Sequence, residues 1–267
     1  MDLDAEYDNR ARVADSAAII AGWAQQAAAF RASWPHATLD LAYGPGDREK
    51  LDLFLPETGP AAPAALFIHG GYWQALDKSW ASHCARGLVM AGVAVGVPSY
   101  DLCPHVPLAR IVEQMRLAAA ALHRRTGRRI LAIGHSAGGH LAAMLMATDW
   151  AARGLPAGLV PAAIPISGVF ELEPLRPTRI GQGLRLNEAE ARLLSPRYMP
   201  PPGGALHCVV GGAESGEFLR QTREFAAAWG GSWEAPAGQN HFTVLAPLQD
   251  PDSGLVARAR AMAAALA

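Results

Sequence analysis

The residues that could perform chemistry centre on one serine in a glycine-rich turn. The sequence Gly134-His135-Ser136-Ala137-Gly138 follows an apolar run that ends at Ile133, and an alanine- and methionine-rich helical pattern begins directly after it. A G-x-S-x-G pattern between a buried strand and a helix is typical of a nucleophile on a sharp, strained turn. The pattern therefore predicts that Ser136 is a nucleophile. The alternative is a tight structural turn, because serines flanked by glycines are common in loops.

A serine hydroxyl is a weak nucleophile near neutral pH and needs a base within hydrogen-bonding reach, itself oriented by a carboxylate. In this strand–turn–helix context the acid and then the histidine follow the serine along the chain. Of the nine histidines, His241 is the one that follows a late strand end, in a glycine-containing loop. His135 and His140 flank the serine, but the turn is expected to point them away from its hydroxyl. We therefore expect His241 to be the base.

The carboxylate should follow the strand that ends near Val210, and two glutamates compete there. Glu214 comes directly after a glycine turn, from which its side chain can turn back toward the histidine. Glu217 falls in the first turn of the next helix, where the helix dipole alone favours a carboxylate. Glu171, after the preceding strand, is a third contender. Glu214 is the preferred acid, with Glu217 as the main alternative.

The charge that develops on a substrate carbonyl oxygen needs backbone N–H donors, and losing one typically costs ~2.7–4 kcal/mol in the transition state. The N–H of Ala137, directly after the serine, is one expected donor. The loop after the first buried strand reads His69-Gly70-Gly71-Tyr72-Trp73, an HGGG-type motif with tyrosine at the third glycine position. Gly71 and Tyr72 are expected to supply further donors, and the Tyr72 and Trp73 side chains to contact an aryl substrate. For Trp73, ordinary packing of the loop on the body is the alternative.

Length and composition favour one well-buried globular enzyme. The chain has 267 residues, 51% of them hydrophobic, and a net charge of −1, so we expect a single domain over residues 1–267 and no nucleic-acid partner. Three cysteines without CxxC spacing, no metal-ligand motif and no nucleotide-binding glycine motif predict no metal and no cofactor. The acidic N-terminus lacks an apolar signal region, and no run reaches ~18 apolar residues. A cytoplasmic location without membrane association is therefore expected.

The elements that must position these residues alternate along the chain. Strands are expected at 39–43, 51–55, 64–68, 93–97, 130–133, 162–166, 207–210 and 232–235. Helices are expected at 16–32 (with Ser16 as N-cap), 76–90, 108–123, 137–152, 218–229 and 256–266. This alternation predicts an α/β fold, a mostly parallel central sheet with helices on both faces, whose ligands bind beyond the carboxyl ends of the strands. Helix 16–32 is expected to cover the body rather than to serve function.

Residues 169–202 interrupt the alternation. No clean strand appears there, prolines recur, and a short helical pattern begins at Asn187. An insertion at this point follows a strand end on the active-site side. It is therefore expected to be either a small cap that shapes the substrate pocket or a plain surface excursion.

These motifs together resemble the α/β-hydrolase superfamily, and within it the arylformamidase (kynurenine formamidase) group, a relative of the hormone-sensitive-lipase-like esterases. The resemblance spans roughly residues 40 to 250 and implies an α/β-hydrolase fold with Ser136 as nucleophile and His241 as base. It implies the residue at position 214 as acid, where the family usually carries aspartate and this chain has glutamate. The matching segments are 69–73, 99–104, 134–142, 212–218 and 240–242.

The resemblance also implies a reaction. The family hydrolyses the formyl amide of N-formyl-kynurenine, and several members act mainly on short-chain or aryl esters. We therefore expect a cofactor-independent serine hydrolase that cleaves a short-acyl aryl formamide or carboxylic ester through an acyl-enzyme, with a general short-chain carboxylesterase as the alternative. A non-catalytic ligand-binding protein on a hydrolase fold is the remaining hypothesis, because fold does not imply function. The partner is expected to be a small-molecule ester or formamide, and the oligomeric state, a homodimer included, is left open.

Overall fold

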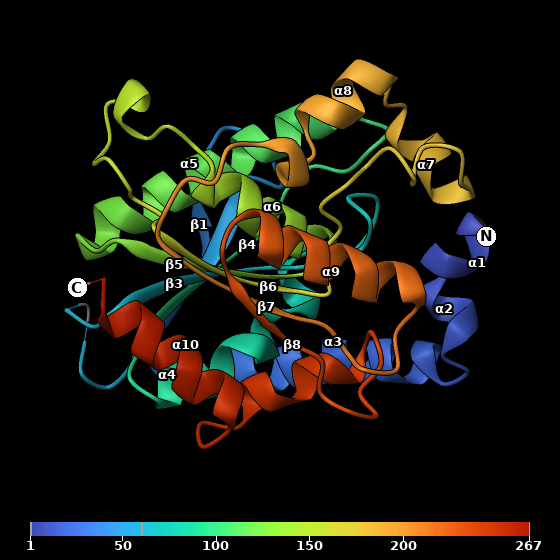
Figure 1. Ribbon diagram of the computed structural model, residues 1–267. Coiled ribbons are helices and arrows are strands. Elements are labelled where there is room, and N and C mark those ends of the chain that lie inside the picture. Colours follow the sequence, from blue (N-terminus) through green and yellow to red (C-terminus); the bar gives the residue numbers. More distant parts are fainter. Residues whose placement is uncertain (1, 60, 267) are drawn as a thin grey trace.

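The computed structural model describes residues 2–59 and 61–266, and its centre is an eight-stranded sheet (Figure 1). The strand order is β1-β2-β4-β3-β5-β6-β7-β8. β1 pairs antiparallel with β2 and β2 with β4, while all other neighbours in the sheet run parallel. The predicted mostly parallel α/β sheet is therefore confirmed. The strands are β1 (Ala37–Ala42), β2 (Lys50–Phe54), β3 (Ala64–Ile68), β4 (Ala94–Pro98), β5 (Ile130–His135), β6 (Ala162–Ile166), β7 (Ala205–Val209) and β8 (Ser232–Glu234).

Helices cover both faces of the sheet, which is why β3 to β6 are buried along their whole length and apolar except for His135 at the end of β5. One hydrophobic cluster forms under α5 (Leu108–Thr126), α6 (Ala137–Met146) and α9 (Gly216–Ala228). A second forms under α3 (Ser16–Ser33), α4 (Arg86–Met90) and α10 (Gly254–Ala264). Figure 1 shows these two sets of helices above and below the strands. The central strand β5 is therefore enclosed on both sides, and its carboxyl end presents Ser136.

Two predicted helices are shorter in the structure than in the sequence pattern. The segment expected as helix 76–90 is split into the 3₁₀ turns η1 (Lys78–Trp80) and η2 (Ser82–Ala85), followed by α4. Helix α6 ends at Met146 instead of reaching residue 152. Side chains beyond that point take over backbone acceptors of its last turn, since the Thr148 hydroxyl donates to the Met144 carbonyl and the Trp150 indole to that of Leu145.

The predicted N-cap of the long N-terminal helix is wrong. Helix α3 begins at Ser16, but its N-cap residue is Asp15, whose side chain makes no capping hydrogen bond. The Ser16 hydroxyl donates instead to the main-chain carbonyl of Arg10 at 3.1 Å. This contact ties α3 to the segment that precedes it.

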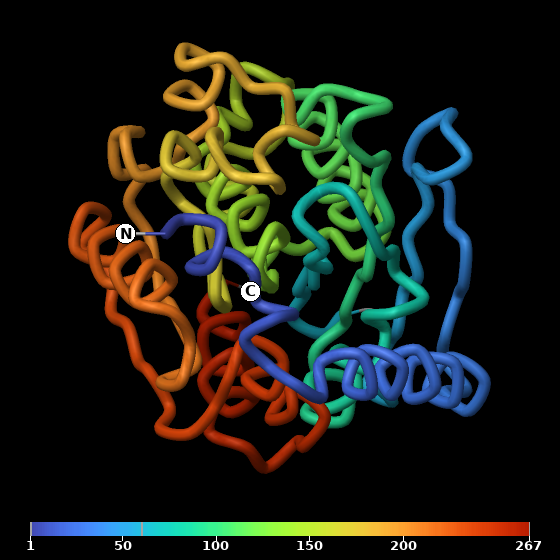
Figure 2. The backbone as a smooth tube through the Cα atoms, turned by 90° about the vertical axis from the view of Figure 1, so that its right-hand side faces the viewer, coloured from blue at the N-terminus to red at the C-terminus, as the bar shows by residue number. Residues whose placement is uncertain are grey.

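Two short helices at the N-terminus were not expected from the sequence. They are α1 (Leu3–Tyr7) and α2 (Asn9–Arg12), capped by the side chains of Asp2 and Asp8. We refer to residues 2–12 as the N-terminal strap. Figure 2 shows it in blue, crossing the face of the molecule between α3 and the golden segment that contains α7 and α8.

The segment from 169 to 202 contains α7 (Arg179–Leu184), α8 (Glu188–Leu193) and the 3₁₀ turn η4 (Pro196–Tyr198). It forms no strand within its length, all of which the structure describes. The N–H of Arg179, at the start of α7, donates to Asp4 of the strap at 2.8 Å. The two segments therefore meet on the same face (Figures 1 and 2). No helix within residues 2–59 and 61–266 is both long and apolar enough to cross a membrane.

Buried histidines make the stability of this fold dependent on pH. His83 in η2 is 2% exposed, and burial lowers its pKa to about 4, against ~6.5 in an unfolded chain. Below pH ~6.5 the unfolded state gains a proton that the folded state does not take up until about pH 4. The contribution of His83 to the free energy of unfolding is therefore fully present above pH ~6.5 and decreases as the pH falls toward 4.

Replacing this histidine should flatten that dependence. In His83→Gln we expect the decrease in unfolding free energy between pH 7 and pH 5 to be smaller than in the wild type by up to about 2 kcal/mol. Urea unfolding at both pH values measures it. His36→Gln is the matched control, because His36 is exposed and should leave the decrease unchanged. Equal pH dependence in the two variants would contradict the prediction.

Candidate active site

Ser136 occupies the junction of β5 and α6 in a strained backbone conformation. Its φ is 55° and its ψ is −118°, a region that residues other than glycine rarely adopt. Its N–H donates to the Ile166 carbonyl of β6 at 2.8 Å, so the turn is tied to the neighbouring strand. A sharp strand-to-helix turn of this kind is the conformation expected of a nucleophile.

Gly138 lets the loop 69–73 pack closely against this turn. A Cβ atom on Gly138 would lie 2.0 Å from the main-chain oxygen of Ile68, at the end of β3. Only glycine therefore permits the first turn of α6 to approach β3 so closely. The approach places the loop 69–73, which follows β3, beside Ser136.

The loop 69–73 is held by its first residue. The His69 ring stacks on Tyr100 with centroids 4.2 Å apart, and its Nδ1 lies 2.8 Å from the Gly70 carbonyl. The Tyr100 hydroxyl donates back to the His69 carbonyl at 2.9 Å. Burial lowers the pKa of His69 to about 4, so the ring is neutral at physiological pH and donates from Nδ1. These contacts fix the backbone that carries the predicted donors.

The three predicted oxyanion donors are unused by the protein itself. The backbone N–H groups of Gly71, Tyr72 and Ala137 have no hydrogen-bond acceptor in the part of the chain that the structure describes. Ala137 is the first residue of α6, where an N–H has no partner within the helix. Gly71 has a φ of 104° and Tyr72 a φ of 51°. The donors are therefore available to a ligand at the start of α6.

The structure brings the predicted acid and base together. His241 Nδ1 lies 2.6 Å from Glu214 Oε2, and the two side chains are nearly fully buried. The other carboxylate oxygen of Glu214 accepts from the Ser167 hydroxyl at 2.5 Å and from the Gly211 N–H at 2.6 Å. Because the chain turns between 211 and 214, the longer glutamate arm folds back on its own loop. Glu214 therefore holds one ring nitrogen of His241 and leaves Nε2 for another partner.

Ser136 and His241 line the same pocket. Within residues 2–59 and 61–266 the Ser136 hydroxyl and the His241 ring are not hydrogen-bonded. Catalytic hydrogen bonds are often long in enzymes without substrate and shorten in the complex. The pocket therefore holds together the two side chains that a proton transfer from the serine would need.

The alternative acids belong to a different network. Glu217 accepts from the Tyr7 hydroxyl at 2.8 Å and from Arg220 at 2.7 Å. Burial opposes its ionisation, yet hydrogen bonds from Arg220, Gln221 and Tyr7 keep its pKa below the usual value. Glu171 also pairs with Arg220, at 2.7 Å. These carboxylates anchor α9 and the N-terminal strap, and neither contacts His241.

The two aromatic residues of the loop have different environments. The Tyr72 hydroxyl donates to the Tyr7 carbonyl at 2.6 Å, and Tyr72 lines the pocket. Burial, with the nearby charge of Glu214, raises its pKa well above the usual value, so it stays a neutral donor. Trp73 is fully buried, edge-on to His140 at 5.0 Å. Trp73 therefore packs the loop on the body, which corrects the expectation that it contacts substrate.

The pocket has a volume of about 810 Å³, and the N-terminal strap supplies much of its wall. Sequence analysis missed the strap because α1 and α2 are too short for a helical period, and only their aspartate caps could have indicated them. It also missed Ser167, whose φ of 50° marks a second strained strand end.

The insertion 169–202 reaches the pocket through two residues of α7. Besides the strap, the lining residues are Ile20, Trp23, Gly71, Tyr72, Gln74, Ala75, Leu76, His135, Ser136, Arg179, Ile180, His241 and Phe242.

Comparison with known proteins gives a consistent result. Residues 65–203 match the protein family described as alpha/beta hydrolase fold. Kynurenine formamidase from Danio rerio is 30% identical over 226 residues, covering 79% of this chain and 77% of that protein. The corresponding enzyme of Salmo salar is 30% identical and covers 80% of this chain and 78% of its own length.

Two solved structures are also similar to this chain. A crystal structure from Silicibacter sp. TM1040, provisionally named a thioesterase, is 39% identical with a TM-score of 0.90, covering 96% of this chain and 98% of that one. A hormone-sensitive lipase from a metagenome library has a TM-score of 0.72 at 20% identity, covering 92% of this chain and 90% of that one. At that identity the second likeness concerns the fold alone.

Proposed function

The chain belongs to the alpha/beta hydrolase fold family, and we propose that it is a serine hydrolase that cleaves a short-acyl aryl formamide or carboxylic ester. One observation supports this most strongly. A serine with a φ of 55° shares a pocket with a histidine whose other side is held by a buried carboxylate at 2.6 Å. A structural turn would need neither the strained serine nor the buried Glu214–His241 pair.

In this proposal the reaction proceeds through an acyl-enzyme. Ser136 Oγ attacks the substrate carbonyl while His241 Nε2 accepts its proton, and Glu214 stabilises the imidazolium through Nδ1–H. The N–H groups of Gly71, Tyr72 and Ala137 hold the developing oxyanion. His241 then protonates the leaving amine or alcohol as its bond to the acyl carbon breaks. A water molecule attacks the acyl-enzyme, gives its proton to His241, and releases formate or a short carboxylate with the serine restored.

The residues that line the pocket support the proposal of a substrate with an aryl leaving group. Aromatic residues from four separate segments line the pocket, namely Tyr7, Trp23, Tyr72 and Phe242. Kynurenine formamidases are relatives at 30% identity, which supports an aryl formamide as the preferred substrate. A general short-chain carboxylesterase is the second candidate. We further propose that residues 169–202 act as a small cap within a single domain, since α7 forms part of the pocket wall.

Two glutamates three residues apart offer a matched test of the mechanism. Glu214→Gln should lower kcat for p-nitrophenyl acetate by about 10²–10⁴-fold with little change in KM, because the amide no longer stabilises the imidazolium. Glu217→Gln should leave kcat within about three-fold, because Glu217 contacts Tyr7 and Arg220 instead. Loss of kcat in Glu217→Gln with a normal Glu214→Gln would refute the assignment of the acid.

The substrate class can be decided by one ratio. We expect kcat/KM for N-formyl-kynurenine to equal or exceed that for a short aryl acetate, with both activities absent in Ser136→Ala. A panel of aryl formamides, esters and thioesters of increasing acyl length measures it. A negligible rate of formamide cleavage beside rapid ester cleavage would favour the second candidate, a general short-chain carboxylesterase. Undiminished turnover in Ser136→Ala would refute both.

A further inference from the structure

The imidazole of His135, the residue before the proposed nucleophile, holds the main chain of the proposed base. His135 Nε2 lies 2.8 Å from the carbonyl oxygen of His241. A carbonyl can only accept, so the neutral ring must carry its hydrogen on Nε2. In the part of the chain that the structure describes, this carbonyl accepts from no other group. The hydrogen bond therefore fixes the peptide that carries the base at a buried point of the fold.

The other side of the same ring abuts the loop that carries the oxyanion donors. A Cβ atom on Gly70 would lie 3.1 Å from His135 Nδ1 and 3.1 Å from the Cβ of Ser136. A side chain at position 70 would therefore press on the imidazole and on the serine, which would have to shift by a few tenths of an ångström. His135 thus touches the loop 69–73 on one side and the His241 peptide on the other, with Ser136 next to it in the chain.

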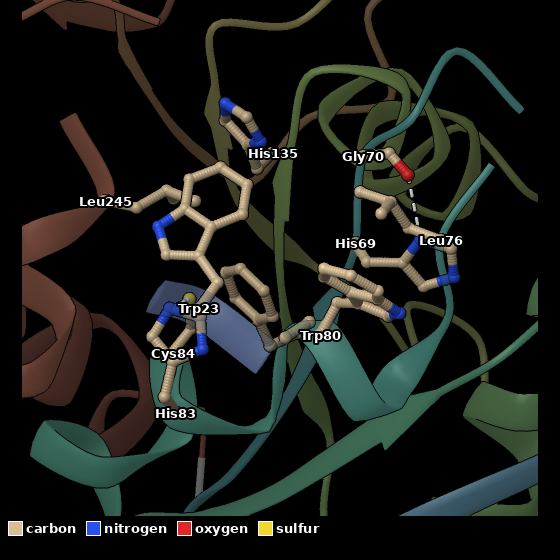
Figure 3. A pocket seen from close by; sticks show the side chains of 11 residues that line it. Trp23, His69, Gly70, Leu76, Trp80, His83, Cys84, His135 and Leu245 are labelled. Carbon is tan, nitrogen blue, oxygen red and sulfur yellow. Dashed lines mark hydrogen bonds between the residues drawn. The ribbon is translucent and has the colours of Figure 1, made fainter. Parts of the chain in front are cut away.

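Neighbouring rings keep the imidazole in place. The indole of Trp23, on α3, meets His135 edge-on at 6.0 Å and also packs on Phe242, the residue after the base. Figure 3 shows His135 and Trp23 on one side of a small cavity, with His69 and Gly70 across from them. Helix α3 was expected only to cover the body, but through Trp23 it supports the loop of the base.

The ring must also stay uncharged while the base is protonated. The His135 and His241 rings are 4.7 Å apart, where two positive charges would repel each other. Burial, and then the proximity of His241, hold the pKa of His135 well below its usual value. His135 therefore offers a fixed dipole to the His241 peptide and does not compete for the proton.

We propose that His135 is a positioning residue, which sets the distance between the base and the oxyanion loop by donating from Nε2 to the His241 carbonyl while packing on Gly70. The proposal rests on the proposed hydrolase function. His135 also lines the pocket, but the proposal gives it no share in proton transfer. Its effect should appear in kcat, since a displaced base affects the chemical step more than substrate binding.

Two substitutions by side chains of similar length test this proposal. His135→Met removes the donor and keeps a side chain of similar length, whereas His135→Gln retains an N–H near the position of Nε2. With p-nitrophenyl acetate we expect His135→Met to lower kcat about 10–100-fold with KM within about two-fold. His135→Gln should recover most of that loss. Equal kcat in the two variants, whether normal or equally reduced, would overturn the proposal because the donor would then be irrelevant.

A measurement on the wild-type protein covers the case in which His135→Met fails to fold. ¹⁵N NMR of the imidazoles at pH 7 should show His135 protonated on Nε2 and not on Nδ1. The opposite tautomer, or a charged ring, would overturn the proposal. A different result is expected if the proposed function itself is wrong. The wild type and Ser136→Ala would then turn over the ester equally. A failure of this inference leaves the wild type active and dependent on Ser136.

Discussion

The arrangement of the site depends on the backbone of Ser136, held at a φ of 55° between β5 and α6. Such a conformation persists only where the surrounding structure fixes it. Here β5 is buried on both sides, the Ser136 N–H is tied to Ile166, and Gly138 lets α6 approach β3. These contacts turn the serine toward the pocket and place the free N–H of Ala137 next to it. The strain is therefore localised where the proposed nucleophile and the proposed oxyanion site must coincide.

The remaining parts of the site are brought to this point by other strand ends. β7 leads to the turn that folds Glu214 back onto its own loop, and β8 leads to the loop of His241. The N-terminal strap, from the opposite end of the chain, supplies much of the pocket wall. Its Tyr7 contacts the loop 69–73 through Tyr72 and the start of α9 through Glu217. One short segment thus links the pocket wall to two of the elements that position the proposed catalytic residues.

Much of the fold and of the proposed site could be predicted from the sequence, because the features that determine them lie close together in the chain. Buried parallel strands read as apolar runs, and the glycines around Ser136 and in the loop 69–73 reflect backbone constraints that sequence patterns express directly. The choice between Glu214 and Glu217 could not be made with certainty, because both follow the same strand and only the turn at 211–214 separates their directions. The strap was missed, and the two alternatives for Trp73 stayed open, because both depend on contacts far apart in the chain. The contact behind the proposed role of His135 was missed for the same reason, since its partner lies 106 residues away.

The central claim is that Ser136 is a nucleophile activated by the Glu214–His241 pair, and covalent labelling tests it most directly. The protein is incubated with a fluorophosphonate, digested with trypsin and analysed by mass spectrometry. The account predicts one phosphonyl group, on Ser136 in the peptide spanning residues 130–153, and a strongly reduced labelling rate in Glu214→Gln. Absence of an adduct on the folded protein, or an adduct confined to another residue, would contradict it.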